Sequence, residues 1–230
     1  NFMNHAPDSR WIMMVREPIQ SCESWIKEPY SEGDYVTISN RVYSMLYDID
    51  NFIFRKHDSR GIRLEDLKIY PEKTIRALCK WMGIKEEETL YKMTVQNKKW
   101  WGDPSSPDFG KKGMDPFDQS SINRKVGTIF TQNDQYILKT LFYPFRVKFN
   151  YEKEDQEKFL RDLEKIRPMI DEAFGFEEKI AKMNHQDIKT FKKSGSFQYL
   201  RSGLIERWNL LNKHKTYPNL IRPLEIFRDY

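Results

Sequence analysis

Residues 11–25 place the strongest constraint on what this chain can fold into. Five largely apolar residues, Trp-Ile-Met-Met-Val, run directly into Arg16, and Pro18 follows two positions later. A continuous apolar run of this length is typical of a strand that is covered on both faces, as in a parallel sheet. Proline is favoured at the first position of a helix, because its missing N–H would have no partner there. The segment therefore predicts a buried strand, followed by a helix that begins at Pro18 and ends before Pro29.

The position of Arg16 suggests a role in anion binding for this segment. In open α/β sheets, ligands bind beyond the carboxyl ends of the strands, where helix N-termini point. A guanidinium group at that place, with hydroxyl groups on the following helix, makes an anion clamp. The alternative is an arginine that forms a salt bridge at the sheet edge and binds no ligand. This segment by itself leaves both interpretations open.

The rest of the first 151 residues alternates strand and helix patterns, which is typical of a parallel α/β sheet. Apolar residues at three- and four-residue steps indicate the helices, and Gly and Pro indicate the boundaries. In chain order we expect a core helix over 38–53, a strand at 61–64, a helix from Pro71 to Gly83, an irregular region over 94–122, a helix over 133–142 and an extended aromatic segment over 143–151.

From residue 152 onward the chain is charged and helical in pattern. We therefore expect an α/β domain over residues 1–151 and a helical extension or arm over 152–230. No apolar run approaches the roughly 20 residues that cross a bilayer, so we expect no membrane segment in this chain. Cys22 and Cys79 form neither a disulfide framework nor a zinc motif, which favours a reducing, cytoplasmic compartment and no metal.

Three sequence blocks, in this order, resemble the sulfotransferases that use 3′-phosphoadenylyl sulfate (PAPS) as donor. The first block is Arg16, Glu17 and Pro18, with Ser24 eight positions after the arginine. The family carries an arginine at the end of a strand and a serine at this spacing, and both hold the 3′-phosphate of the nucleotide. The resemblance therefore implies that Arg16 and Ser24 bind this phosphate.

The second and third blocks extend the resemblance over roughly residues 7–151. Residues 61–68, with Pro71 and the Gly-Ile pair at 83–84, are similar to the family's strand, Glu-Asp-Leu turn and following helix. Leu64 stands where many cytosolic members have a tyrosine that touches the adenine. Residues 124–127, Arg-Lys-Val-Gly, resemble a shortened form of the loop that closes over the nucleotide. This match implies that the nucleotide also contacts Arg124, Lys125 and Gly127.

The resemblance implies a P-loop-like parallel sheet flanked by helices, incomplete at the N-terminus, with a C-terminal helical extension. The family's glycine-rich phosphosulfate loop and its usual catalytic base precede the first block, and no such loop occurs before Arg16. We therefore expect this sequence to be the carboxyl-terminal part of a longer sulfotransferase. The catalytic residues are therefore unassigned. His5 could be proposed as the base, but it lies in a turn that leads into the strand, which argues against this role.

The implied activity is transfer of the sulfuryl group from PAPS to a hydroxyl or amine, which leaves 3′,5′-adenosine diphosphate (PAP). We expect a small-molecule or carbohydrate acceptor, with Trp100 and Trp101 as an aromatic wall of its pocket. The alternative for this tryptophan pair is that it pins its loop to the core.

Two other classes of protein remain open at this point. The first is a non-catalytic relative that keeps the sulfotransferase-like scaffold and binds a nucleotide or a protein partner. The second is a nucleic-acid-binding module, in which lysines surround the tryptophan pair. The 34 acidic residues beside 39 basic ones argue against nucleic acid as a partner. An upstream signal anchor, which would change the compartment, and the oligomeric state both stay open.

Overall fold

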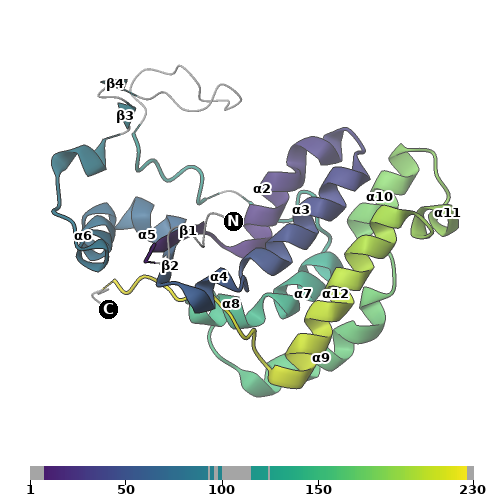
Figure 1. Ribbon diagram of the computed structural model, residues 1–230. Coiled ribbons are helices and arrows are strands. Elements are labelled where there is room, and N and C mark those ends of the chain that lie inside the picture. The colour runs from purple at the N-terminus through teal and green to yellow at the C-terminus, as the bar shows by residue number, and fades with distance from the viewer. Residues whose placement is uncertain (1–7, 93, 96–97, 100–114, 124, 227–230) are drawn as a thin grey trace. The chain divides into compact units, whose positions relative to one another are not determined.

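The structure is a computed structural model that describes residues 8–226 except 93, 96–97, 100–114 and 124 (Figure 1). The chain forms two compact units, and each is assembled from separate stretches of sequence. The helical unit comprises the described residues among Asn1–Trp11, Arg16–Ser59 and Lys125–Arg222. The sheet unit comprises the described residues among Ile12–Val15, Arg60–Arg124 and Pro223–Tyr230.

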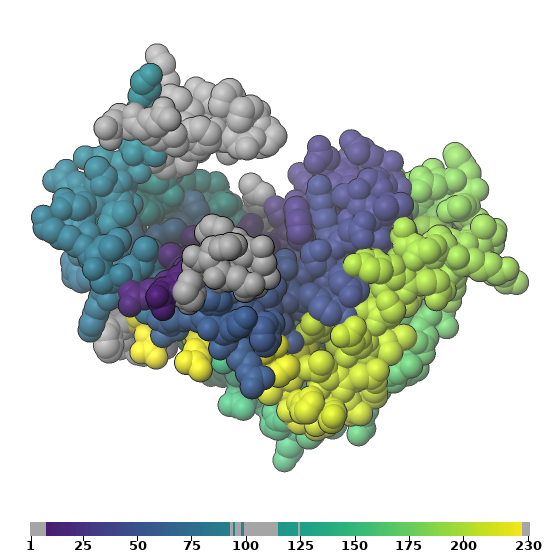
Figure 2. All heavy atoms as spheres, in the orientation of Figure 1, coloured from purple at the N-terminus to yellow at the C-terminus, as the bar shows by residue number. Residues whose placement is uncertain are grey.

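The helical unit is organised around α3 (Tyr35–Asp48), which packs against both α2 (Pro18–Ser31) and α12 (Gly195–His214). Figure 2 shows the atoms of α12 lying along those of α3. Residues Ile38, Val42 and Leu46 on α3 are fully buried, because four-residue steps place them on one face. The remaining helices of this unit are α4 (Ile53–Lys56), α7 (Gln132–Leu141), α8 (Tyr143–Lys148), α9 (Gln156–Ile170), α10 (Gly175–Met183) and α11 (Ile188–Lys192).

The sheet unit contains a small parallel sheet of β1 (Trp11–Val15) and β2 (Ser59–Arg63). The C-terminal segment joins β2 through a parallel bridge between Gly61 and Pro223, and the Leu224 N–H donates to the Gly61 carbonyl at 2.8 Å. The other elements of this unit are α5 (Leu64–Ile69), α6 (Pro71–Met82), a 3-10 turn η1 (Glu88–Tyr91) and an antiparallel pair, β3 (Thr94–Val95) and β4 (Lys98–Lys99).

The expected strand over 11–15 is confirmed, but its expected burial on both faces is wrong. The side chains of Ile12 and Met14 are 44% and 49% exposed. The parallel sheet in the described residues has two strands and one further bridge, which is too narrow to be enclosed by two layers of helices. The coarse α/β arrangement of parallel strands with helices around them is present.

The predicted end of the first helix is also wrong, because α2 continues through Pro29 to Ser31. A proline inside a helix leaves the carbonyl four residues earlier without its N–H donor. Here that carbonyl belongs to Trp25, and the Arg41 guanidinium of α3 donates to it. A side chain from a neighbouring helix thus replaces the missing backbone donor.

Residues 143–151 are not extended as expected, because α8 occupies most of this segment. Pro144 lies in the first turn of α8, where proline is tolerated. The rings of Phe145 and Phe149 stack with centroids 4.5 Å apart and both side chains are buried. Four-residue spacing of large aromatic residues favours a helix once a core is available to bury them.

The two compact units differ from the two segments that the sequence predicted, 1–151 and 152–230. Helix α9 packs against α7, and α12 packs against α3, so most of the expected C-terminal extension belongs to the helical unit. The apolar stripes of α9 and α12 explain this arrangement, since an amphipathic helix buries its apolar face against a partner. Within the described ranges, no helix has both the length and the apolar character needed to cross a bilayer.

Replacing Gly203 with alanine tests the close approach of α12 to α3. A Cβ atom at Gly203 would lie 2.5 Å from two carbons of the Tyr43 ring, which is stacked between Tyr47 and Tyr199. We expect Gly203→Ala to lower the free energy of unfolding by about 1–3 kcal/mol, although alanine normally favours a helix. Urea unfolding followed by circular dichroism measures this change.

Gly195 on the same helix provides the control, because a Cβ atom there meets nothing within 4 Å. Gly195→Ala should leave stability unchanged or raise it by up to about 1 kcal/mol. Equal unfolding midpoints for the two variants would contradict the close contact between Gly203 and Tyr43.

Candidate functional site

The predicted strand-to-helix turn at Arg16 is present. Glu17 caps α2, since its carboxylate accepts a hydrogen bond from the Gln20 N–H at 2.8 Å, and Pro18 occupies the first helical position. The Glu17 carboxylate also lies 3.2 Å from the Arg146 Nε, and Arg146 in turn pairs with Glu152 at 2.7 Å. The turn is therefore fixed both by its own cap and by an arginine from α8.

Arg16 precedes α2, and its side chain binds Gln20 in the first turn of the helix, four residues before Ser24. The Arg16 Nε donates to the Gln20 Oε1 at 2.8 Å, so the guanidinium runs along the first turn of the helix. Gln20 is buried, Arg16 is half-buried and Ser24 is exposed. Residues four positions apart lie on the same helix face. Gln20 and Ser24 therefore share a face of α2, and the hydrogen bond to Gln20 directs the Arg16 side chain toward that face.

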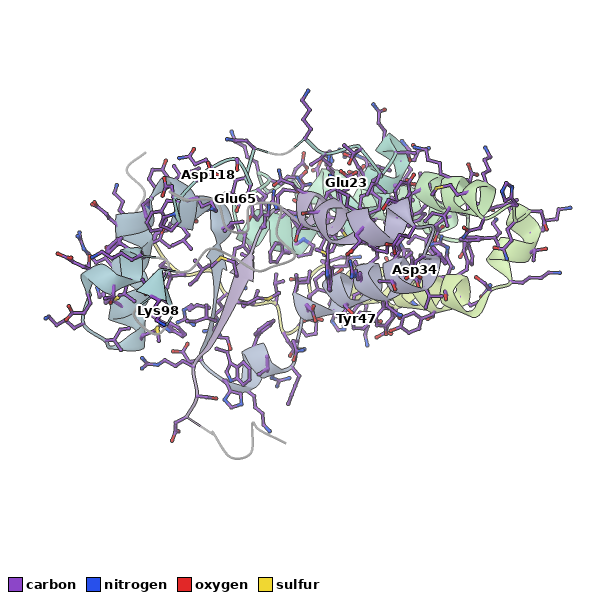
Figure 3. The ribbon with its side chains drawn as sticks, turned by 90° about the horizontal axis from the view of Figure 1, so that it is seen from above. Glu23, Asp34, Tyr47, Glu65, Lys98 and Asp118 are labelled. Atoms are coloured by element: carbon purple, nitrogen blue, oxygen red, sulfur yellow. The ribbon has the colours of Figure 1, made fainter. Side chains whose placement is uncertain are left out.

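Glu23 links α2 to the segment 127–130, which we call the Glu23-bound loop. Figure 3 labels Glu23 on α2. Its carboxylate is 5% exposed and accepts hydrogen bonds from the N–H groups of Gly127 at 3.0 Å, Ile129 at 3.2 Å and Phe130 at 2.8 Å. The Thr128 N–H and hydroxyl lie 3.4 and 3.3 Å from the same carboxylate. Several backbone donors thus neutralise one buried negative charge.

The Glu23-bound loop holds the predicted site segment that contains Lys125 against α2, the helix that carries Ser24. Ile129 and Phe130 are buried, and the Phe130 ring meets the Phe176 ring edge-on at 5.3 Å. Lys125 is exposed and lies two residues before the loop, so its Cα is within about 7 Å of the Gly127 Cα. Ser24 directly follows Glu23 on α2. Contacts at Glu23 therefore hold the surroundings of Ser24 and Lys125 together.

The structure gives Gly127 a different role from the predicted contact with a phosphate. Its N–H donates to Glu23 and is already occupied. Its φ of +97° is a conformation that glycine adopts without strain and other residues rarely adopt. Gly127 is therefore needed to shape the loop, and its N–H is not among the proposed phosphate contacts.

Three other predicted site residues, Arg124, Trp100 and Trp101, lie outside the described residues, as does His5. Their expected roles stay predictions.

The thiol of Cys22 lies on α2 next to Glu23 and is fully buried. Burial raises its pKa strongly, and the nearby charges of Glu17 and Glu23 raise it further. A thiol with a raised pKa carries little thiolate at neutral pH, so Cys22 is a core residue and not a nucleophile.

The Glu-Asp-Leu turn in the sheet unit follows β2 directly, as predicted, and forms the short helix α5. Arg63 at the carboxyl end of β2 lies 3.7 Å from the Asp66 carboxylate and 4.0 Å from that of Glu65. The Thr74 hydroxyl of α6 donates to the Asp66 carbonyl at 3.0 Å. These contacts give the acidic residues of the turn a structural function within the sheet unit.

Gln20 and Glu23 are candidate functional-site residues that the sequence alone does not predict. Gln20 had a recognisable signal, because it lies midway between Arg16 and Ser24 at helical spacing. Glu23 had none, since its partners are backbone groups more than 100 residues away in the chain. Among the described residues, no group of three or more His, Cys, Asp or Glu side chains is arranged to hold a metal ion.

Comparisons with protein-family models, with curated proteins and with solved structures find no match to this chain.

Removing the Glu23 carboxylate tests its hold on the loop. Glu23→Ala leaves several buried N–H groups without an acceptor, so we expect the free energy of unfolding to fall by about 3 kcal/mol. Hydrogen exchange followed by mass spectrometry should show faster exchange of the amides of residues 127–130. Glu28→Ala, an exposed position on the same helix, should change stability by less than about 0.5 kcal/mol. Unchanged amide exchange in the Glu23 variant would contradict the described contact.

Proposed function

We propose that this chain is a PAPS-dependent sulfotransferase that carries the nucleotide-holding part of a P-loop-like α/β fold. Arg16, Ser24 and Lys125 are the proposed contacts to the 3′-phosphate of the donor. The observation that carries this proposal is the attachment of the Lys125 segment to α2 by Glu23, beside Ser24 on the same helix and near Gln20, to which Arg16 donates a hydrogen bond.

The chemistry of these three side chains suits a phosphate dianion. A guanidinium group offers several N–H donors in a planar fork, a hydroxyl donates one hydrogen bond, and an ammonium group adds a compact positive charge. The Glu23 carboxylate lies next to the proposed site, but it is buried and accepts backbone N–H groups. Its negative charge is therefore not exposed to the phosphate. The hydrogen bond to Gln20 orients the Arg16 guanidinium before a ligand arrives.

In the proposed reaction, an acceptor hydroxyl or amine attacks the sulfur atom of PAPS. A bond forms between the acceptor and sulfur, the bond from sulfur to the bridging phosphate oxygen breaks, and PAP leaves. A general base takes the acceptor proton. The contribution of Arg16, Ser24 and Lys125 is to fix the donor in one orientation, because positioning accounts for much of the rate of such group transfers.

A non-catalytic nucleotide-binding protein would use the same contacts. The experiment that separates the two is a transfer assay with radiolabelled PAPS and a panel of sugar, alcohol and amine acceptors. Appearance of a sulfated product supports the enzyme. Binding of PAP without transfer to any acceptor supports the non-catalytic relative, and failure to bind PAP contradicts both.

Arg16→Ala tests the proposed phosphate contact. We expect the affinity for PAP to fall about 10- to 100-fold, because a charge-assisted hydrogen bond to the 3′-phosphate is lost. The affinity for 5′-AMP, which lacks this phosphate, should change little. Isothermal titration calorimetry of both nucleotides measures the difference.

Lys27→Ala is the matched control, since it removes one exposed positive charge from α2, the helix that follows Arg16, and should leave both affinities unchanged. Ser24→Ala should lower PAP affinity by a smaller factor than Arg16→Ala. If the Arg16 variant loses affinity equally for PAP and 5′-AMP, then Arg16 does not recognise the 3′-phosphate.

A further inference from the structure

The sheet unit contains a basic groove with a volume of about 630 Å³. Its lining includes four basic side chains, one tryptophan and one carboxylate: Arg60, Lys73, Arg76, Lys80, Trp81 and Glu225. We call this feature the α6 groove. Cavities of about this volume are typical of ligand sites in proteins.

Helix α6 supplies one wall of the groove with regularly spaced charges. Lys73, Arg76 and Lys80 are separated by three and four residues, so they lie on one face of the helix. The first and last of them are about 10 Å apart along the helix axis, from a rise of 1.5 Å per residue. All three side chains are exposed, and Arg76 also pairs with Glu86 at 3.2 Å. The wall is therefore an extended row of basic side chains, of which Arg76 has a carboxylate partner.

Strand β2 and the C-terminal segment supply the other lining residues. The Arg60 guanidinium lies over the Trp81 ring at 5.6 Å from its centroid. The backbone pairing of Leu224 with Gly61 holds the segment that carries Glu225 against β2. Figure 1 shows this segment running past β2.

The described residues that line the α6 groove differ from the proposed nucleotide contacts. Arg60 is the second residue of β2, and its guanidinium meets the ring of Trp81 at the end of α6. None of Arg16, Ser24 and Lys125 is among the described lining residues.

We infer that the α6 groove binds a linear acidic glycan with several sulfate or carboxylate groups. The four basic side chains outnumber the two nearby carboxylates, Glu225 in the lining and Glu86 paired with Arg76, which favours a polyanion. The spread of Lys73, Arg76 and Lys80 along two turns of α6 favours an extended chain over a single phosphate group. A single-stranded nucleic acid needs exposed aromatic faces for base stacking. The only aromatic side chain that lines the described groove is Trp81, which is half-buried and faced by Arg60. This inference goes beyond the proposed nucleotide site and does not depend on it.

The test uses a fluorescently labelled, heparin-derived octasaccharide and fluorescence anisotropy over a range of salt concentrations. The double variant Lys73→Ala, Lys80→Ala should bind the octasaccharide at least tenfold more weakly than the unaltered chain, with a shallower salt dependence. The control double variant Lys179→Ala, Lys182→Ala removes the same charge from exposed positions on α10 and should bind within twofold of the unaltered chain.

Three results would overturn the inference: no binding by the unaltered chain, an equal loss in both double variants, or equally tight binding of a single-stranded oligonucleotide of the same charge. PAP affinity of the Lys73, Lys80 variant should be unchanged. Because glycan binding and PAP binding are measured separately, failure of this site and failure of the nucleotide site are distinguishable.

Discussion

Buried carboxylates that accept backbone N–H groups hold the helical unit together. Glu23 binds the loop at 127–130, and Asp134 accepts from the Gly175 and Phe176 N–H groups at 2.8 and 3.1 Å. Glu177 is completely buried, accepts from the Phe174 N–H at 2.7 Å and is bound by the Tyr35 hydroxyl and the Arg201 guanidinium. A buried charge is tolerated only when its hydrogen-bonding capacity is satisfied. Each of these carboxylates therefore requires one particular arrangement of loop and helix around it, and the packing of α2, α7 and α10 depends on that arrangement.

The proposed nucleotide site depends directly on one of these carboxylates. Gln20 and Ser24 share a face of α2 because of helical geometry, and a hydrogen bond from Arg16 to Gln20 brings Arg16 to that face. Lys125 comes near that helix only because Glu23 binds the loop that follows it. The supporting residues are thus a buried glutamate and a glycine with positive φ, and neither is proposed to touch the ligand. Such a division between supporting and contacting residues is expected at a site that must be shaped before its ligand binds.

Local structure was predictable where short-range chemistry decides it. Pro18 and Pro71 begin helices, and Gly83 ends one with a left-handed conformation, because these residues have strong backbone preferences. The helix end predicted before Pro29 was wrong, because the Arg41 side chain of a different helix replaces the missing donor. The extended segment predicted over residues 143–151 was also wrong. Its aromatic residues favour a strand locally, but in the folded unit they stack and are buried at α8. Tertiary contacts overrode local preference in both cases.

The sequence by itself determined the strand at 11–15 and the turn at Arg16 that leads into a helix at Pro18, because each follows from contacts within a few residues. It also carried the resemblance on which the proposed function rests. Only the tertiary structure decided that Glu23 holds the loop at 127–130, that α9 and α12 belong to the same unit as α3 and α7, and that Lys73, Arg76 and Lys80 share a groove with Arg60. These features join residues far apart in the chain, and no local pattern specifies which distant groups will meet a buried charge or an apolar helix face.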